Sequence, residues 1–83
     1  MTESESAQSD PEDYYLEKAK QAELEYDAID VLTEILLEAL VWGQKVDDAQ
    51  VREEFKTKFG VDGLKRIKEQ ASILARRRMN DVS

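Results

Sequence analysis

Apolar side chains recur at intervals of three and four residues along most of the chain from residue 11 onward. This spacing places them on one face of an α-helix, whereas no segment shows the two-residue alternation of a half-buried strand. The pattern therefore predicts an all-α protein without a sheet. We expect a small helical bundle of one long N-terminal helix and two shorter helices, over about residues 11–42, 48–59 and 63–79.

The first of these helices is predicted to be continuous, because it contains no glycine and its one proline, Pro11, stands at its start. Apolar residues in its first half form a narrow stripe, which is typical of a coiled-coil seam. From Ala28 onward the apolar arc is broader and its centre is rotated by roughly 90°, so a kink would fall near Asp27. The stripe consists of Tyr15, Ala19, Ala22, Tyr26 and Ile29.

A continuous helix over residues 11–42 would be about 50 Å long at 1.5 Å per residue. A compact domain of 83 residues cannot cover that length. We therefore expect the narrow stripe to pair with a second copy of the chain, which would make the protein a homodimer that self-associates through its long N-terminal helix.

Local signals mark the ends of the predicted elements. Pro11 suits the first position of a helix, and Gly43 and Gly60 stand where helices would end. Residues 1–10 are polar, acidic and without periodicity, so we expect a disordered tail, and we expect residues 81–83 to fray. We expect residues 11–80, between these termini, to form a single helical domain.

Composition narrows the chemistry that is available to this chain. It contains neither cysteine nor histidine, which removes disulfides, thiolate metal sites and the usual proton carrier at neutral pH. There is also no glycine-rich phosphate loop. We therefore expect a non-enzymatic protein without cofactor or metal. No apolar run approaches the roughly 18 residues of a membrane span, and no secretory signal is evident, so we expect a cytoplasmic location.

Charge is distributed unevenly between the two halves of the chain, whose formal net charge is −7. Residues 1–42 hold 12 acidic and 2 basic side chains, whereas residues 43–83 hold 7 acidic and 10 basic ones. Such asymmetry is typical of halves that attract each other, within one fold or across a dimer. It is also typical of a nucleic-acid-facing end or an acidic interaction surface.

Three consecutive arginines near the C-terminus raise the question of a binding patch. Successive helical residues are 100° apart, so Arg76, Arg77 and Arg78 span about 200° and cannot form one flat patch. Arg78 falls on the apolar seam of the third predicted helix, and the other two flank it. We therefore expect Arg78 to lie within salt-bridge distance of a carboxylate from residues 12–38. Exposure of all three arginines away from the acidic half would instead favour a nucleic-acid contact.

Some apolar residues lie off the predicted core faces. Leu37 and Ile73 fall on the polar sides of their helices, and Trp42 stands beside the turn at Gly43. A second apolar face on a helix that already has a core face indicates a partner, and tryptophan is favoured at interfaces. We therefore expect Leu37, Trp42 and Ile73 to bind another protein. The leading hypothesis is a protein–protein interaction module, acting as a small regulator, adaptor or inhibitor.

A DNA-binding regulator is the first alternative. The pair of helices within residues 48–79, joined by a short turn at Gly60, resembles a helix-turn-helix motif in outline. The second helix of such a motif enters the major groove of DNA. The residues available for that contact are Lys65, Arg66, Lys68, Arg76 and Arg77.

An acidic mimic of nucleic acid is the second alternative. Such a protein would occupy the basic groove of a partner with a regular row of carboxylates. The residues available for it are Glu23, Glu25, Asp27, Asp30 and Glu34.

Overall fold

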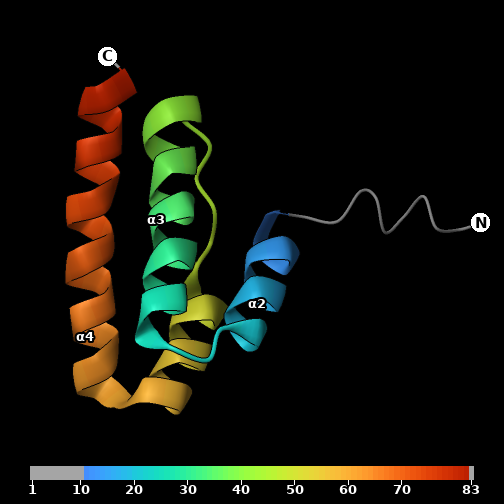
Figure 1. Cartoon of the computed structure of the whole chain (residues 1–83). Coiled ribbons are helices and arrows are strands. Elements are labelled where there is room, and N and C mark those ends of the chain that lie inside the picture. Colours follow the sequence, from blue (N-terminus) through green and yellow to red (C-terminus); the bar gives the residue numbers. More distant parts are fainter. Residues whose placement is uncertain (1–10, 83) are drawn as a thin grey trace, which may run out of the picture.

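The computed structural model describes residues 11–82, which form three helices. They are α2 (Pro11–Gln21), α3 (Glu25–Trp42) and α4 (Ala49–Val82), as Figure 1 shows. All regular structure in the described range is helical, so the predicted all-α class is confirmed. The tail predicted to be disordered, residues 1–10, lies outside the described residues. The fraying expected for residues 81–83 stays a prediction; α4 extends to Val82.

The prediction of one long N-terminal helix is wrong. The chain leaves the helix after Gln21, is extended at Leu24 (φ −118°, ψ 154°), and re-enters it at Glu25. The break therefore falls before Asp27, where a kink was expected. Residues 22–24 include neither glycine nor proline, so the cause of the break is not local.

A lysine from α4 stabilises the break. The Nζ atom of Lys58 donates hydrogen bonds to the carbonyl oxygens of Ala19 (3.0 Å), Lys20 (2.6 Å) and Ala22 (2.7 Å). The last carbonyls of a helix have no partner within it, and a cation beside them also complements the negative end of the helix dipole. Lys58 thus caps α2 from a position 36 to 39 residues further along the chain.

The longest helix is C-terminal. The two shorter helices expected over residues 48–59 and 63–79 form the single element α4, which is sharply kinked at Gly60 (φ 83°, ψ 172°). The Oδ1 atom of Asp47 accepts a hydrogen bond from the backbone N–H of Ala49 (3.0 Å) at its start. The sequence pattern therefore located both halves of α4, which lie on either side of the non-helical residue Gly60.

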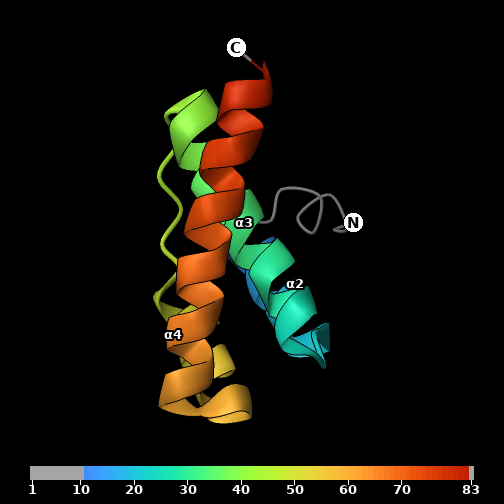
Figure 2. The same cartoon turned by 60° about the vertical axis from the view of Figure 1, so that its left-hand side comes forward.

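The helices pack in one bundle. In both Figure 1 and Figure 2, α3 and the second half of α4, residues 61–82, lie side by side and run in the same direction. The connection over residues 43–48 returns along α3, and the first half of α4 then crosses the opposite end of the bundle. Helix α2 folds back against α3 on the side away from residues 61–82 of α4 (Figure 1). As a result, the C-terminal ends of α3 and α4 lie next to each other.

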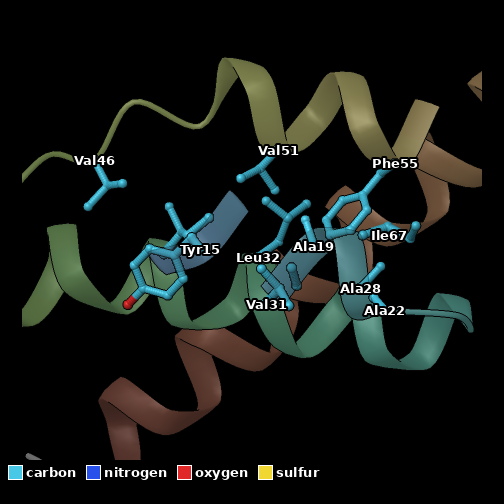
Figure 3. Packing of buried hydrophobic residues seen from close by; sticks show 12 residues of the cluster. Tyr15, Ala19, Ala22, Ala28, Val31, Leu32, Val46, Val51, Phe55 and Ile67 are labelled. Carbon is cyan, nitrogen blue, oxygen red and sulfur yellow. The ribbon is translucent and has the colours of Figure 1, made fainter. Parts of the chain in front are cut away.

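The core lies where these helices meet (Figure 3). Phe55 and Ile67 of α4 are fully buried, and Leu32 of α3 packs in the same cluster. Thr33 is also fully buried, and its hydroxyl donates a hydrogen bond to the carbonyl oxygen of Ile29 (2.7 Å). The remaining buried members are Tyr15, Ala19, Ala22, Ala28, Val31, Ile35, Val46, Val51 and Ala71.

Candidate protein-interaction surface

The last turn of α3 is apolar and exposed. Leu40, Val41 and Trp42 lie beyond the core, and the side chain of Trp42 is 74% exposed. Gly43 ends the helix in the left-handed conformation (φ 67°), and its N–H bonds to the carbonyl of Ala39 (3.1 Å). Because the chain turns away at this residue, no later segment covers the turn before it. Exposed tryptophans of this kind favour an interaction site.

Three arginines occupy the adjacent end of α4. Arg76, Arg77 and Arg78 are all exposed. The prediction that Arg78 pairs with a carboxylate of residues 12–38 is wrong, because no ion pair of Arg78 occurs within the part of the chain that the structure describes. The parallel course of α3 and α4 explains this result. It brings the arginines beside the apolar last turn of α3, which carries no acidic residue.

Together these residues form what we call the α3–α4 end: Leu40, Val41, Trp42, Arg76, Arg77 and Arg78. Figures 1 and 2 show that the two helix ends lie next to each other at one extreme of the bundle. Lys45 is exposed on the connection that leaves α3. This end is therefore cationic and apolar, whereas the whole chain is acidic.

The three partner-binding residues predicted from sequence are not equally available. Trp42 is exposed within the α3–α4 end, and Ile73 is exposed on α4 one helical turn before Arg76 and Arg77. Leu37 is only partly exposed, because it lies nearer the middle of the bundle. Leu40 and Val41 are also exposed and belong to the same surface.

The stripe predicted to mediate self-association lies mostly inside the chain's own core. Tyr15, Ala19 and Ala22 are buried, Ile29 is partly buried, and only Tyr26 is exposed. The break after Gln21 folds α2 back onto α3 and α4, so the stripe packs within one copy. In this fold these residues do not form a seam that a second copy could reach.

The hydroxyl of Tyr15 is hydrogen-bonded within the same chain. It donates a hydrogen bond to Oε2 of Glu38 in α3 (3.2 Å). Burial raises the pKa of Tyr15, and the negative charge of Glu38 raises it further. This hydrogen bond also occupies the carboxylate of α3 nearest to the α3–α4 end.

Of the basic residues proposed for DNA, Arg66 is already engaged. Its Nη2 lies 2.6 Å from Oε2 of Glu25, and a second bond joins its Nε to Oε1 of that carboxylate. This bidentate pair lowers the pKa of Glu25 and raises that of Arg66. Lys65, Lys68, Arg76 and Arg77 are exposed.

The acidic residues of α3 line an open groove against α2. The groove has a volume of about 380 Å³, and its lining includes Asp27, Asp30 and Glu34, together with Lys18 of α2. Among the side chains that the structure describes, no three acidic ones converge closely enough to hold a metal ion. Glu23 is exposed beside this groove, whereas Glu25 is taken up by Arg66.

A smaller cavity of about 180 Å³ lies between α3 and α4. Its apolar lining comes from Leu32, Leu36 and Ala71, and its charged rim comes from Lys68 and the Asp48–Arg52 ion pair (3.2 Å). That size suits a single side chain rather than a cofactor. We assign it no role.

Comparison with known proteins returned no match: no protein-family description fits the chain, and neither the curated proteins nor the solved structures gave a significant similarity. Among the helices that the structure describes, none is both long enough and apolar enough to cross a membrane.

Proposed function

We propose that this protein is a non-enzymatic interaction module that binds another protein through its α3–α4 end. The observation that carries the proposal is the exposure of Trp42 at the end of α3, next to the end of α4 on which Arg76, Arg77 and Arg78 are exposed. Tryptophan and arginine are the residue types most enriched among the side chains that dominate binding energy. A regulator, adaptor or inhibitor would need such a surface and no catalytic group.

The chemistry of this surface selects the partner. Arg76, Arg77 and Arg78 favour a segment that carries carboxylates, while Leu40 and Trp42 favour apolar side chains within the same segment. The remainder of the chain is acidic and repels such a partner. We therefore expect an acidic, partly apolar protein segment to dock at this end in one orientation.

Affinity capture from the source cell, followed by mass spectrometry, tests this proposal when it is run with and without nuclease. A partner retained after nuclease treatment is then measured against the variant Trp42→Ala. We expect that variant to lose about 2 kcal/mol of binding free energy, which is about a 30-fold increase in Kd.

The matched control is Val61→Ala, because Val61 is also a strongly exposed apolar residue but lies at the kink of α4, away from the α3–α4 end. Its Kd should equal that of the wild type. Equal affinity of Trp42→Ala and Val61→Ala for the captured partner would contradict the proposed surface.

A second candidate function is nucleic-acid binding. The exposure of Arg76, Arg77 and Arg78, with no carboxylate of the described chain engaging them, supports it. Binding to duplex DNA should then weaken steeply with salt, and Lys65→Gln should weaken it further. Absence of binding at low salt would eliminate this candidate. The acidic-mimic hypothesis stays a prediction.

A further inference from the structure

Residues 22–24, which we call the hinge, connect α2 to α3 against their own conformational preference. Ala22, Glu23 and Leu24 are all strong helix formers. Leu24 occupies the N-cap position of α3 but makes no side-chain cap hydrogen bond, and its side chain is 63% exposed. Leucine is among the least favourable N-cap residues. Local chemistry thus favours a helical hinge over the observed break.

Tertiary contacts of α2 oppose this local preference. Lys58 binds the carbonyls of Ala19, Lys20 and Ala22 where the helix stops, and the carbonyl of Ala19 also accepts a hydrogen bond from the N–H of Ala22 (3.2 Å). In a helical hinge those carbonyls would accept hydrogen bonds from the N–H groups four residues further on. The other tertiary contacts of α2 are the hydrogen bond of Tyr15 to Glu38 and the burial of its apolar side chains.

The contacts of the α2 side chains can be made by a second copy equally well. Tyr15 and Ala19 pack in one core cluster with residues of α3 and α4, and nothing in that packing requires them to belong to the same chain. Exchange of an identical element between copies conserves such contacts and changes only the hinge. When the hinge prefers the open conformation, exchange becomes favourable as the protein concentration rises.

We propose that this protein forms a dimer by reciprocal exchange of α2, with the hinge becoming helical and each α2 occupying the site on α3 and α4 of the other copy. The occupant of that site is therefore a second copy of this chain. This inference goes beyond partner binding at the α3–α4 end and does not depend on it.

The exposure of Tyr26 supports this arrangement independently. Tyr26 is the second residue after the hinge, and its side chain is 73% exposed. In a helical hinge, Tyr26 lies four residues after Ala22 on the face that α2 presents to the core. Helix α2 runs antiparallel to α3, because Tyr15 near its start reaches Glu38 late in α3 while Ala22 lines a groove with Val31.

A two-fold dimer built from these antiparallel contacts places the two hinges next to each other. Each Tyr26 then faces the α2 segment of the other copy. Its side chain is therefore buried in the dimer and exposed in the monomer. Tyr26→Ala should therefore weaken the dimer while leaving the unfolding of the monomer unchanged.

Two variants at different sites should shift the dimer in opposite directions. Leu24→Asp supplies the missing N-cap of α3, and it does so in the closed monomer alone. Because each dimer contains two hinges, this variant should raise the dimer dissociation constant at least about tenfold. Lys58→Met removes bonds that exist only in the closed monomer, so it should lower that constant. Lys56→Met is the matched control, because Lys56 is an exposed lysine on the same helix without a hydrogen bond in the described structure.

Sedimentation equilibrium over micromolar to millimolar concentrations measures these constants. Isotope-filtered nuclear Overhauser spectra of a mixed-label dimer then show whether Tyr15 of one chain contacts α3 of another. Intermolecular contacts together with opposite shifts for Leu24→Asp and Lys58→Met support the exchange. A wild type that stays monomeric throughout, a dimer whose α2 contacts remain within one chain, or shifts in the same direction would overturn it.

Discussion

At the scale of single residues, two glycines determine the path of the chain through their backbone angles. Gly43 lies in the left-handed helical region (φ 67°, ψ 17°), and Gly60 lies in an extended region with positive φ (φ 83°, ψ 172°). A Cβ atom at either position would meet no atom within 4 Å. Any cost of substitution therefore comes from backbone conformation, and the two regions differ in that cost.

Gly60→Ala should destabilise the protein more than Gly43→Ala. The left-handed region costs other residues about 1 to 2 kcal/mol, whereas the region of Gly60 is essentially restricted to glycine and costs up to about 3 kcal/mol. Urea unfolding of both variants measures the difference. An equal loss in both variants would show that α4 changes its path at residue 60 when it loses the glycine.

Tyr15 is the residue whose ionisation is most strongly coupled to folding. Its pKa rises above the ordinary value of 10.0, first because the side chain is buried and then because Glu38 lies beside it. The folded protein therefore keeps Tyr15 protonated when the unfolded chain would ionise it. This coupling stabilises the fold below pH 10 and is lost progressively as the pH rises above that value.

Tyr15→Phe should lower the free energy of unfolding by about 1 kcal/mol at neutral pH, because it removes one hydrogen bond. The gap between the two proteins should shrink above pH 10, since only the wild type loses stability through ionisation of this side chain. Chemical denaturation at a series of pH values measures the gap. A gap that stays constant up to pH 11 would contradict the assigned burial of the hydroxyl.

At the scale of elements, α2 is the helix that tertiary contacts define most strongly. It is only 11 residues long, and isolated helices of that length are marginal in water. Its C-terminal end depends on Lys58 of α4, and its burial depends on two side chains of its own, Tyr15 and Ala19, with Leu16 partly buried. It is therefore the element best suited to open without unfolding the rest of the bundle.

Hydrogen exchange under monomeric conditions should show this local opening. Amides of α2 should exchange faster than the buried amides of α3 and α4, and Lys58→Met should accelerate them selectively. Lys56→Met should leave all three helices unchanged. Uniform acceleration of all helices by Lys58→Met would mean that α2 opens only when the whole protein unfolds.

The helices of α4 illustrate how much the sequence pattern can predict. Gly60 and the four-residue spacing of Val51, Phe55 and Phe59 located both halves of α4 within a few residues. The break after Gln21 had no such signal, because its residues are helix formers and its cause, Lys58, is far along the chain. The candidate surface was predicted in part, through Trp42 and Ile73.

At the scale of the whole molecule, positive and negative charges are separated. The α3–α4 end is cationic and apolar, while Asp27, Asp30 and Glu34 line a groove on another face. The opposite charges of the two halves of the chain meet at Arg66 and Glu25, and not at Arg78. The arginine triplet is consequently left available to a partner.

Trp42 is the only tryptophan, so its fluorescence reports on the α3–α4 end alone. The emission of the free protein should be that of a solvent-exposed indole and should shift to the blue when a partner covers it. Dimerisation through α2 should leave the emission unchanged, because Trp42 lies at the opposite end of α3 from the hinge. A blue shift on dimerisation would show that the dimer contact covers the α3–α4 end, which would contradict the exchange of α2.

The sequence by itself determined the all-α class, the apolar faces of the helices, and the turns at Gly43 and Gly60. These features follow from periodicity and backbone sterics, which act over a few residues. The tertiary structure decided the break between α2 and α3, the burial of Tyr15 and the solvent exposure of Arg78. Those outcomes depend on contacts between residues that are far apart in the sequence. A carbonyl, a hydroxyl or a guanidinium bonds to whichever group the packing of the helices places within reach.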